Sequence, residues 1–304
     1  MASPLKKQLE YDIMPKLRTF TAYWFVLPAM LFFFLLAIYP SGFVIFLSIF
    51  ASGKGTAINA AHPSISNFLA VWNNPNFIKI MTQTLYYALG ATILHVTVGF
   101  SFALILNILP LNPVFIRAMR TIFLIPWAIT PTVVAILFRL LLHPQVGPIA
   151  IFLKSIGSPI LFGPLGQPKW ALLSVTLTNT WMFTPFYMLM ILSALQAVDP
   201  GLYEAAVVDG ANGAQQIFFI TIPMIRNTLL TLAMFDFVTT AAYFDLTWIM
   251  TQGGPVGTSE IIPTWVYRTA FQSFEFGKAS AIGLILFSIS VIVSIIVLRA
   301  MDKE

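Results

Sequence analysis

The sequence contains no cysteine and few charged residues. Without cysteine, neither a disulfide framework nor a thiolate metal site can form. Charged residues make up 9% of the 304 positions, whereas soluble domains carry about 25%. Hydrophobic residues make up 58%, and the mean hydropathy is +0.87. This composition predicts an integral membrane protein that is embedded in a lipid bilayer.

Catalytic and nucleotide-binding motifs are also missing. His62, His95 and His143 lie far apart in the sequence, so we expect no metal site. The segment around Lys54 fails as a phosphate-binding loop, because Gly55 stands where the motif needs serine or threonine. An enzyme inside the membrane would need a clustered nucleophile and base or a metal motif, so we expect no enzyme activity. The net charge of +5 is thinly spread and predicts no nucleic-acid partner.

Long apolar runs predict six transmembrane helices, since one span needs about 20 apolar residues. The first run is too long for the apolar part of a signal peptide, which has about 7–15 residues. We expect an all-α membrane protein with an N-terminal tail, a first span, an extracytoplasmic loop, a core with five further spans and a C-terminal tail. These parts cover residues 1–22, 23–50, 51–80, 81–299 and 300–304, and the five core spans cover 82–109, 116–142, 170–195, 226–250 and 279–298.

Basic residues predict the orientation of these spans. Six spans place both termini on one side of the membrane, and that side carries nine basic residues. The opposite side carries six over much longer loops. Lysine and arginine accumulate on the cytoplasmic side, so we expect both termini and the segment 199–223 in the cytoplasm. The nine residues are Lys6, Lys7, Lys16, Arg18, Arg117, Arg120, Arg226, Arg299 and Lys303.

The segment 199–223 differs from the apolar runs around it and predicts two short helices. Asp199 suits a helix N-cap, and Pro200 suits the first helical position. Gly210 can end the first helix in a left-handed conformation. Asn212 and Gln215 have capping-box spacing for the second helix. A helix lying on the membrane surface would favour lysine and arginine, but residues 199–221 contain neither.

The same segment resembles the "EAA" loop of membrane subunits of ATP-driven, binding-protein-dependent importers. The match includes Glu204-Ala205-Ala206, Asp209-Gly210-Ala211, Ile220 and Pro223. The resemblance implies the type I ABC importer permease fold, with a coupling helix that docks on a separate ATPase. Its docking residues would be Tyr203, Glu204, Ala205, Ala206, Val207, Asp209, Gly210 and Ala211. ATP and magnesium would then bind to the partner ATPase, and this chain would hold no cofactor.

Two later segments are similar to the carbohydrate branch of that family, the branch for maltose and glycerol phosphate. They are Phe244–Pro255, with its "FD" and "GGP" elements, and Tyr267–Ala281. The resemblance implies a multi-pass permease of the bacterial inner membrane that imports a sugar, an oligosaccharide or a polyol glycoside. Its partners would be a second, related permease in a heterodimer, an ATPase dimer and an extracytoplasmic binding protein. The binding protein would contact Gly253, Gly254 and Pro255, which also suit a plain turn.

Polar residues within the spans are expected to face the bundle interior or a cavity. Asp236 suits either a structural hydrogen bond to a neighbouring helix or a hydroxyl acceptor in a sugar pathway. Asn179 and nearby aromatic rings suit a sugar, which has both hydroxyl groups and an apolar face. We expect His95 to be packed and neutral, because no acid lies near it in the sequence. The proposed pathway residues are Asn179, Trp181, Tyr187, Asp236 and Tyr243.

An ion-coupled secondary transporter or a channel is the alternative function. It would need a relay of paired charges inside the membrane. Only Asp236, Asp245 and Arg139 are available, and they form no obvious ladder in the sequence. Uptake that survives ATP depletion but is lost with the ion gradient would favour this alternative.

Overall fold

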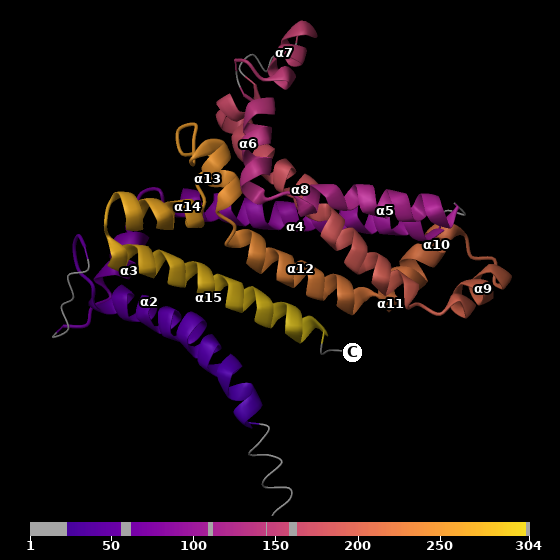
Figure 1. Ribbon diagram of the computed structural model, residues 1–304, viewed down its shortest axis with the longest axis horizontal. Coiled ribbons are helices and arrows are strands. Elements are labelled where there is room, and N and C mark those ends of the chain that lie inside the picture. Colours follow the sequence, from indigo (N-terminus) through magenta and orange to yellow (C-terminus); the bar gives the residue numbers. More distant parts are fainter. Residues whose placement is uncertain (1–22, 56–61, 109–111, 144, 158–162, 302–304) are drawn as a thin grey trace, which may run out of the picture.

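The computed structural model describes residues 23–55, 62–108, 112–143, 145–157 and 163–301. Most long helices run along one axis of an elongated bundle (Figure 1). The α9 end of the bundle carries α9 (Pro200–Val208) and α10 (Gly213–Gln216), and the α14 end carries α3 (Ser66–Trp72) and α14 (Ile262–Tyr267). The predicted tail 1–22 and the last residues, 302–304, lie outside the described residues. Within the described ranges the chain is helical and contains no β-strand, as the composition predicts.

Six spans can be counted among the described residues. Three single helices are long and apolar enough to cross a membrane, and three bent helix pairs supply the rest if each pair is one span. The first helix, Tyr23–Phe50, covers the predicted first span, and α2 (Tyr39–Phe50) is its second half. The other main helices are α4 (Phe77–Ile108), α5 (Pro113–Ala128), α6 (Pro131–Leu141), α8 (Pro168–Gln196), α12 (Arg226–Ala241) and α15 (Phe276–Met301).

The third span is broken, which corrects the expectation of one continuous helix over 116–142. Its two halves, α5 and α6, meet at 88°. The break lies at Pro131, because proline disfavours the helical conformation at the residue before it. Thr130 accordingly has extended backbone angles, with φ −62° and ψ 140°. As a result α6 leaves the bundle and continues into α7 (Pro148–Ser155), forming an arm at right angles to the long axis (Figure 1).

Other boundaries also differ from the prediction. The expected loop 51–80 contains α3, and α4 begins at Phe77, where Asn74 accepts a backbone hydrogen bond from Asn76. The fifth span was expected to reach residue 250. Instead α12 ends at Ala241, where a turn joins the Tyr243 nitrogen to the Thr240 carbonyl oxygen at 3.0 Å. The following residues 245–251 form a separate short helix, α13 (Asp245–Thr251).

Two π-helical turns precede prolines. The turn η1 (Phe34–Ile38) ends two residues before Pro40, and η3 (Ile217–Thr221) ends two residues before Pro223. Proline donates no backbone hydrogen bond, and its ring crowds the carbonyl group one turn earlier. The wider π-helical turn relieves that contact, so both helices continue through their prolines. Pro223 therefore lies inside α11 (Ile222–Met224), and the helical segment that begins before it runs through it without a break.

The bundle is built on the close packing of α4 against α8. A Cβ added at Gly99 would lie 3.0 Å from the Tyr187 Cβ and 3.1 Å from the Met188 backbone nitrogen. Ala103, one turn further along α4, is fully buried. The two small residues Gly99 and Ala103 therefore allow the two backbones to approach closely, which is a common way to pack membrane helices.

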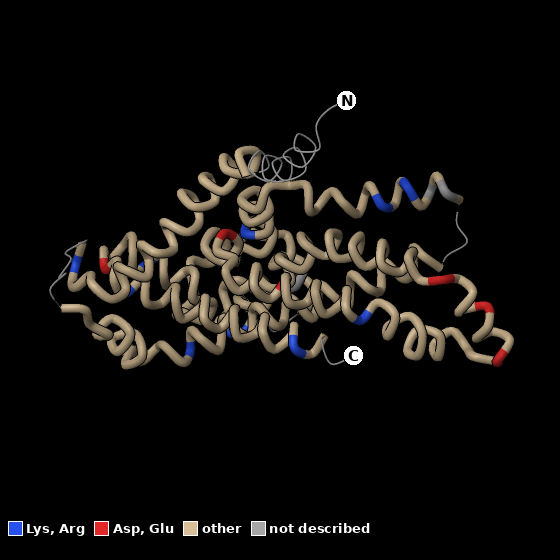
Figure 2. Tube along the Cα trace, turned by 90° about the horizontal axis from the view of Figure 1, so that it is seen from below, with Lys and Arg blue, Asp and Glu red and all other residues tan. Residues whose placement is uncertain are grey.

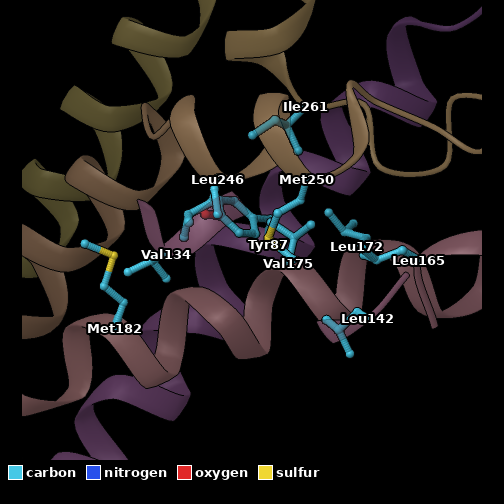
Figure 3. Packing of buried hydrophobic residues seen from close by; sticks show 11 residues of the cluster. Tyr87, Val134, Leu142, Leu165, Leu172, Val175, Met182, Leu246, Met250 and Ile261 are labelled. Carbon is cyan, nitrogen blue, oxygen red and sulfur yellow. The ribbon is translucent and has the colours of Figure 1, made fainter. Parts of the chain in front are cut away.

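A second buried cluster fixes the base of the arm to the bundle. Tyr87 of α4 lies at its centre and contacts apolar side chains from α6, α8 and α13 (Figure 3). Its labelled members are Tyr87, Val134, Leu142, Leu165, Leu172, Val175, Met182, Leu246, Met250 and Ile261. Dispersion contacts of this kind replace the hydrophobic effect as the main packing force between helices in lipid.

Candidate functional site

A buried polar cluster joins three helices in the middle of the bundle. His95 of α4 and Asp236 of α12 are 0% and 2% exposed, and the His95 Nδ1 lies 3.0 Å from each carboxylate oxygen. The hydroxyl of Tyr187, from α8, donates a hydrogen bond to the Asp236 Oδ1. The Thr240 hydroxyl donates to the same oxygen at 3.2 Å. A buried carboxylate needs such partners, because an isolated charge in this environment is costly.

His95 is packed as predicted, but it does face an acid. Its Nε2 lies 3.2 Å from the backbone carbonyl oxygen of Asn179, and its ring stacks on Tyr187 with centroids 5.0 Å apart. Both ring nitrogens face acceptors, so both can donate only when the ring carries two protons. The expectation of a neutral histidine rested on the absence of an acid nearby in the sequence, whereas the fold places the Asp236 carboxylate against the ring.

A cavity of about 240 Å³ lies beside this cluster. Six aromatic rings form most of its wall, and Asp236, Thr239 and Thr240 add polar atoms. The Tyr243 hydroxyl oxygen is buried and has no hydrogen-bond partner among the described residues. Trp127 and Phe235 remain 45% and 50% exposed, so the cavity lies at the surface of this chain. The aromatic residues are Trp127, Phe183, Phe186, Tyr187, Phe235 and Tyr243.

Three of the five predicted pathway residues meet at this cavity, namely Tyr187, Asp236 and Tyr243. Asn179 does not line it. Its side chain is fully buried, and neither amide atom has a partner among the described residues. Trp181 lies in the wall of a different cavity of about 290 Å³, together with residues of α4 and α5, and its ring packs on Phe138 at 5.1 Å.

Sequence reasoning missed several members of the wall, although one signal was present. Asp236, Thr239 and Thr240 are spaced i, i+3 and i+4, which places them on one face of α12, and Tyr243 follows just beyond the end of that helix. A polar stripe at this spacing in an apolar span indicates an interior face. His95 carried no such signal, because its acidic partner is 141 residues away.

The segment 199–223, which we call the coupling loop, has the predicted local structure. The Asp199 side chain accepts from the Gly201 nitrogen at 2.9 Å and caps α9. Gly210 is left-handed, with φ +81°. Asn212 and Gln215 form a capping box, with bonds of 2.9 and 2.8 Å.

The coupling loop projects from the α9 end of the bundle, where three acidic positions mark its tip (Figure 2). Most residues predicted to dock are exposed, including Glu204, Val207 and Asp209. Tyr203 is half-buried, and its hydroxyl oxygen lies 3.1 Å from the Thr221 Oγ1. The loop therefore offers an acidic and apolar surface that is held by its own caps.

The segment 252–261, which we call the outer loop, lies at the α14 end and contains the predicted turn. Gln252, Gly253 and Val256 are left-handed, and Val256 is 86% exposed. Lys79 donates to the Val256 carbonyl oxygen at 3.1 Å, and Gln83 donates to the next two carbonyl oxygens.

An ion pair completes the outer loop. Arg268 donates to the Gln252 carbonyl oxygen at 2.9 Å and lies 3.4 Å from a carboxylate oxygen of Glu260. Burial raises the pKa of Glu260, and the positive charges of Arg268 and Lys79 partly oppose that shift. Within the described part of the chain, no group of His, Cys, Asp and Glu side chains could hold a metal ion.

Comparisons with known proteins identify the family. Residues 96–303 match the family described as "Binding-protein-dependent transport system inner membrane component". The chain is 28% identical over 272 residues to a sulfoquinovosyl glycerol transport system permease protein of Agrobacterium fabrum, covering 90% of this chain and 87% of that protein. It is 30% identical over 268 residues to a maltodextrin transport system permease protein of Streptococcus pneumoniae, covering 79% of this chain and 60% of that protein.

The fold has a close structural counterpart. The chain matches a bacterial ABC transporter involved in the import of the acidic polysaccharide alginate, with a TM-score of 0.81 and 23% identity. That match covers 97% of this chain and 99% of the other. The architecture and the match over residues 96–303 agree, so the chain belongs to the family of binding-protein-dependent transport system inner membrane components.

Proposed function

We propose that this permease forms one half of a membrane pathway for a carbohydrate. The observation that carries the proposal is the cavity of aromatic rings around Asp236 and the unpartnered Tyr243 hydroxyl. Ring faces suit the apolar face of a sugar, and the carboxylate and the phenol suit its hydroxyl groups. The names of the relatives, which refer to sulfoquinovosyl glycerol and maltodextrin, support a substrate of this class.

The exposed side of the cavity supports a pathway that two chains share. Trp127 and Phe235 would face a second permease, which completes the cavity. We propose a related but different chain as that partner, giving a heterodimer. The wall in this chain combines one carboxylate with aromatic rings, and a different second wall would supply the remaining hydrogen-bond partners of an asymmetric sugar.

The two ends of the bundle suit two further partners. The permease lacks a phosphate-binding loop, and in transporters of this family the ATPase is a separate subunit. We propose that the exposed face of the coupling loop, from Tyr203 to Ala211, docks on that ATPase, which binds ATP and magnesium. The outer loop, with Gly253, Gly254 and Pro255, would contact the binding protein. We propose, from the distribution of the basic residues, that the α9 end and both termini lie in the cytoplasm.

Transport would proceed by alternating access. Closure of the ATPase on ATP would move α9 and, through the loop, α12, which carries Asp236. The cavity would then open towards the α14 end and receive the sugar from the binding protein. Hydrolysis of ATP would return the permease to its starting conformation. The family assignment favours this ATP-driven mechanism over an ion-coupled transporter or channel.

The docking surface can be tested with the Glu204→Lys and Gly210→Asp substitutions in the complete, reconstituted transporter. Both change the exposed face of the coupling loop, so we expect sugar uptake to fall at least about tenfold, the effect of a loss of ~1.4 kcal/mol. ATP hydrolysis would continue without transport. The matched variant Glu204→Gln removes the charge without reversing it and should lose less. Normal uptake by Glu204→Lys would contradict the docking assignment.

The cavity can be tested with Tyr243→Phe and Tyr187→Phe. The Tyr243 hydroxyl has no hydrogen-bond partner among the residues that the structure describes, so its removal should leave the unfolding temperature unchanged. The half-saturating sugar concentration should rise about fivefold, as expected for one lost hydrogen bond of ~1 kcal/mol. Tyr187→Phe instead removes a bond to Asp236 and should lower the unfolding temperature. If Tyr243→Phe leaves uptake unchanged, this cavity does not bind the substrate.

A further inference from the structure

The charges around the cavity narrow the class of carbohydrate that this permease accepts. This inference rests on the proposed function. Among the described residues of the wall, Asp236 is the only lysine, arginine, histidine, aspartate or glutamate. The other members are aromatic residues and two threonines. The wall therefore presents one carboxylate and no cation to a ligand.

The imidazole that pairs with Asp236 lies behind it. His95 is 0% exposed and is absent from the cavity wall, although its Nδ1 lies 3.0 Å from both carboxylate oxygens. The negative end of the pair thus faces the cavity. His95, Tyr187 and Thr240 already bond to the carboxylate, which keeps Asp236 in place when the cavity is empty.

The basic side chains of α12, α4 and α5 are not members of the cavity wall. Arg226 is ten residues before Asp236, which is about 15 Å along a helix at 1.5 Å per residue. Lys79 is in the first turns of α4 and bonds to the outer loop. Arg117 and Arg120 lie in the first half of α5, whereas Trp127 is near its other end.

Five further cations among the described residues lie at helix ends or in the arm. Arg139 of α6 donates to the Ile249 carbonyl oxygen at 3.2 Å, and Arg268 pairs with Glu260. Lys169 lies in the first turn of α8 and Lys278 in the first turn of α15, where it pairs with Glu275. Arg299 lies in the last turn of α15. Each is therefore held at an end of its helix or in the arm.

We infer that the sugar unit accepted by this half of the pathway is uncharged. A carboxylate or sulfonate group on the ligand would meet Asp236 in a cavity walled mainly by aromatic rings, where like charges repel. Hydroxyl groups can instead donate to Asp236 and accept from Tyr243. The volume of about 240 Å³ lies below the ~300–1,000 Å³ of typical ligand pockets, which suits one sugar unit at a time in this half.

The test uses the complete transporter in proteoliposomes, with its second permease, ATPase and binding protein. Uptake is measured for maltotriose, cellotriose and galactotriose, and for trigalacturonate, which has the backbone of galactotriose with a carboxylate on each unit. We expect at least about tenfold faster uptake of one neutral trisaccharide than of trigalacturonate. Preferred uptake of trigalacturonate would overturn the inference while leaving carbohydrate import in place. ATP hydrolysis with no uptake of any of these sugars would contradict the proposed function itself.

A pair of substitutions separates this chain from the binding protein, which also selects ligands. Thr239→Lys adds a cation to the wall, and Thr239→Met adds a side chain of similar length without charge. We expect Thr239→Lys to raise the ratio of trigalacturonate to neutral uptake at least about tenfold, and Thr239→Met to leave it near the native value. Equal ratios in the two variants would show that cavity charge does not select the substrate.

Discussion

The loops at the two ends of the bundle are held in different ways. In the coupling loop, the described side-chain hydrogen bonds join residues of the loop to each other, as in Asn212 with Gln215 and Tyr203 with Thr221. In the outer loop, they come largely from other elements: Lys79 and Gln83 of α4, and Arg268 beyond α14.

This difference suggests different mechanical roles. A loop that is stabilised by its own caps can keep its shape while it moves against the rest of the chain. A loop that is tied to α4 and to Arg268 keeps its position relative to the bundle instead. We therefore expect the coupling loop to move as a unit on the ATPase, and the outer loop to present a fixed surface.

The largest expected effect on stability comes from substituting two left-handed glycines, one in each loop. A side chain at either position is strained by about 1–2 kcal/mol, since φ is +82° at Gly253 and +81° at Gly210. At Gly253 the new Cβ would also lie 3.3 Å from the Arg268 Nη2 and from the Glu260 Cβ, whereas at Gly210 it would meet open space.

Gly253→Ala should therefore lower the unfolding temperature of the purified protein more than Gly210→Ala does. The difference corresponds to about 1 kcal/mol, because only the first substitution also disturbs the ion pair and the bond to the Gln252 carbonyl. Equal shifts would mean that the outer loop is no more tightly braced than the coupling loop.

A smaller, local effect is expected from Asn212→Ala. This substitution removes the cap of α10 and should cost about 1 kcal/mol of local stability. Amide hydrogen exchange should quicken about fivefold over residues 213–216 and stay unchanged over residues 252–261. Asn212→Asp keeps a cap and serves as the control. Faster exchange at both ends would show that the coupling loop is not an independent unit.

The smallest expected effect is a pH dependence of the unfolding temperature that arises in the outer loop. Because burial raises the folded pKa of Glu260 above its unfolded value of about 4.3, folding favours the protonated form. The stabilisation is complete below the unfolded pKa and is lost as pH rises through the folded pKa. The unfolding temperature of the native protein should fall over that window relative to Glu260→Gln, which stays neutral. Parallel curves of unfolding temperature against pH for the native protein and Glu260→Gln would place Glu260 in a more hydrated site.

Local features of the coupling loop could be predicted because each depends on a few adjacent residues. Asp199, Gly210 and the Asn212–Gln215 pair act through backbone groups within three positions, so their roles follow from spacing alone. The break at Thr130 was equally local, since Pro131 disfavours a helical conformation at the residue before it. That rule was available from the sequence, although proline is often tolerated within membrane helices.

The polar cluster could not be predicted in the same way. The pairing of His95 with Asp236 depends on how α4, α8 and α12 cross, and nothing near either residue specifies the other. The same holds for Trp181, which has the right side chain for a sugar but lies in the wall of another cavity. A single sequence indicates which residues belong in an interior, but not which helix faces meet there.

Gly99 limits where this permease can bend. At this position α4 and α8 are in backbone contact, so neither helix can slide along the other without a steric clash. The two helices should therefore rotate as one rigid body. We then expect hinge motion at the non-helical junctions 129–130 and 242–244. The first junction closely follows Trp127 of the cavity wall, and the second contains Tyr243 of the same wall. A change of angle at either junction would alter the shape of the cavity while the α4–α8 pair stays intact.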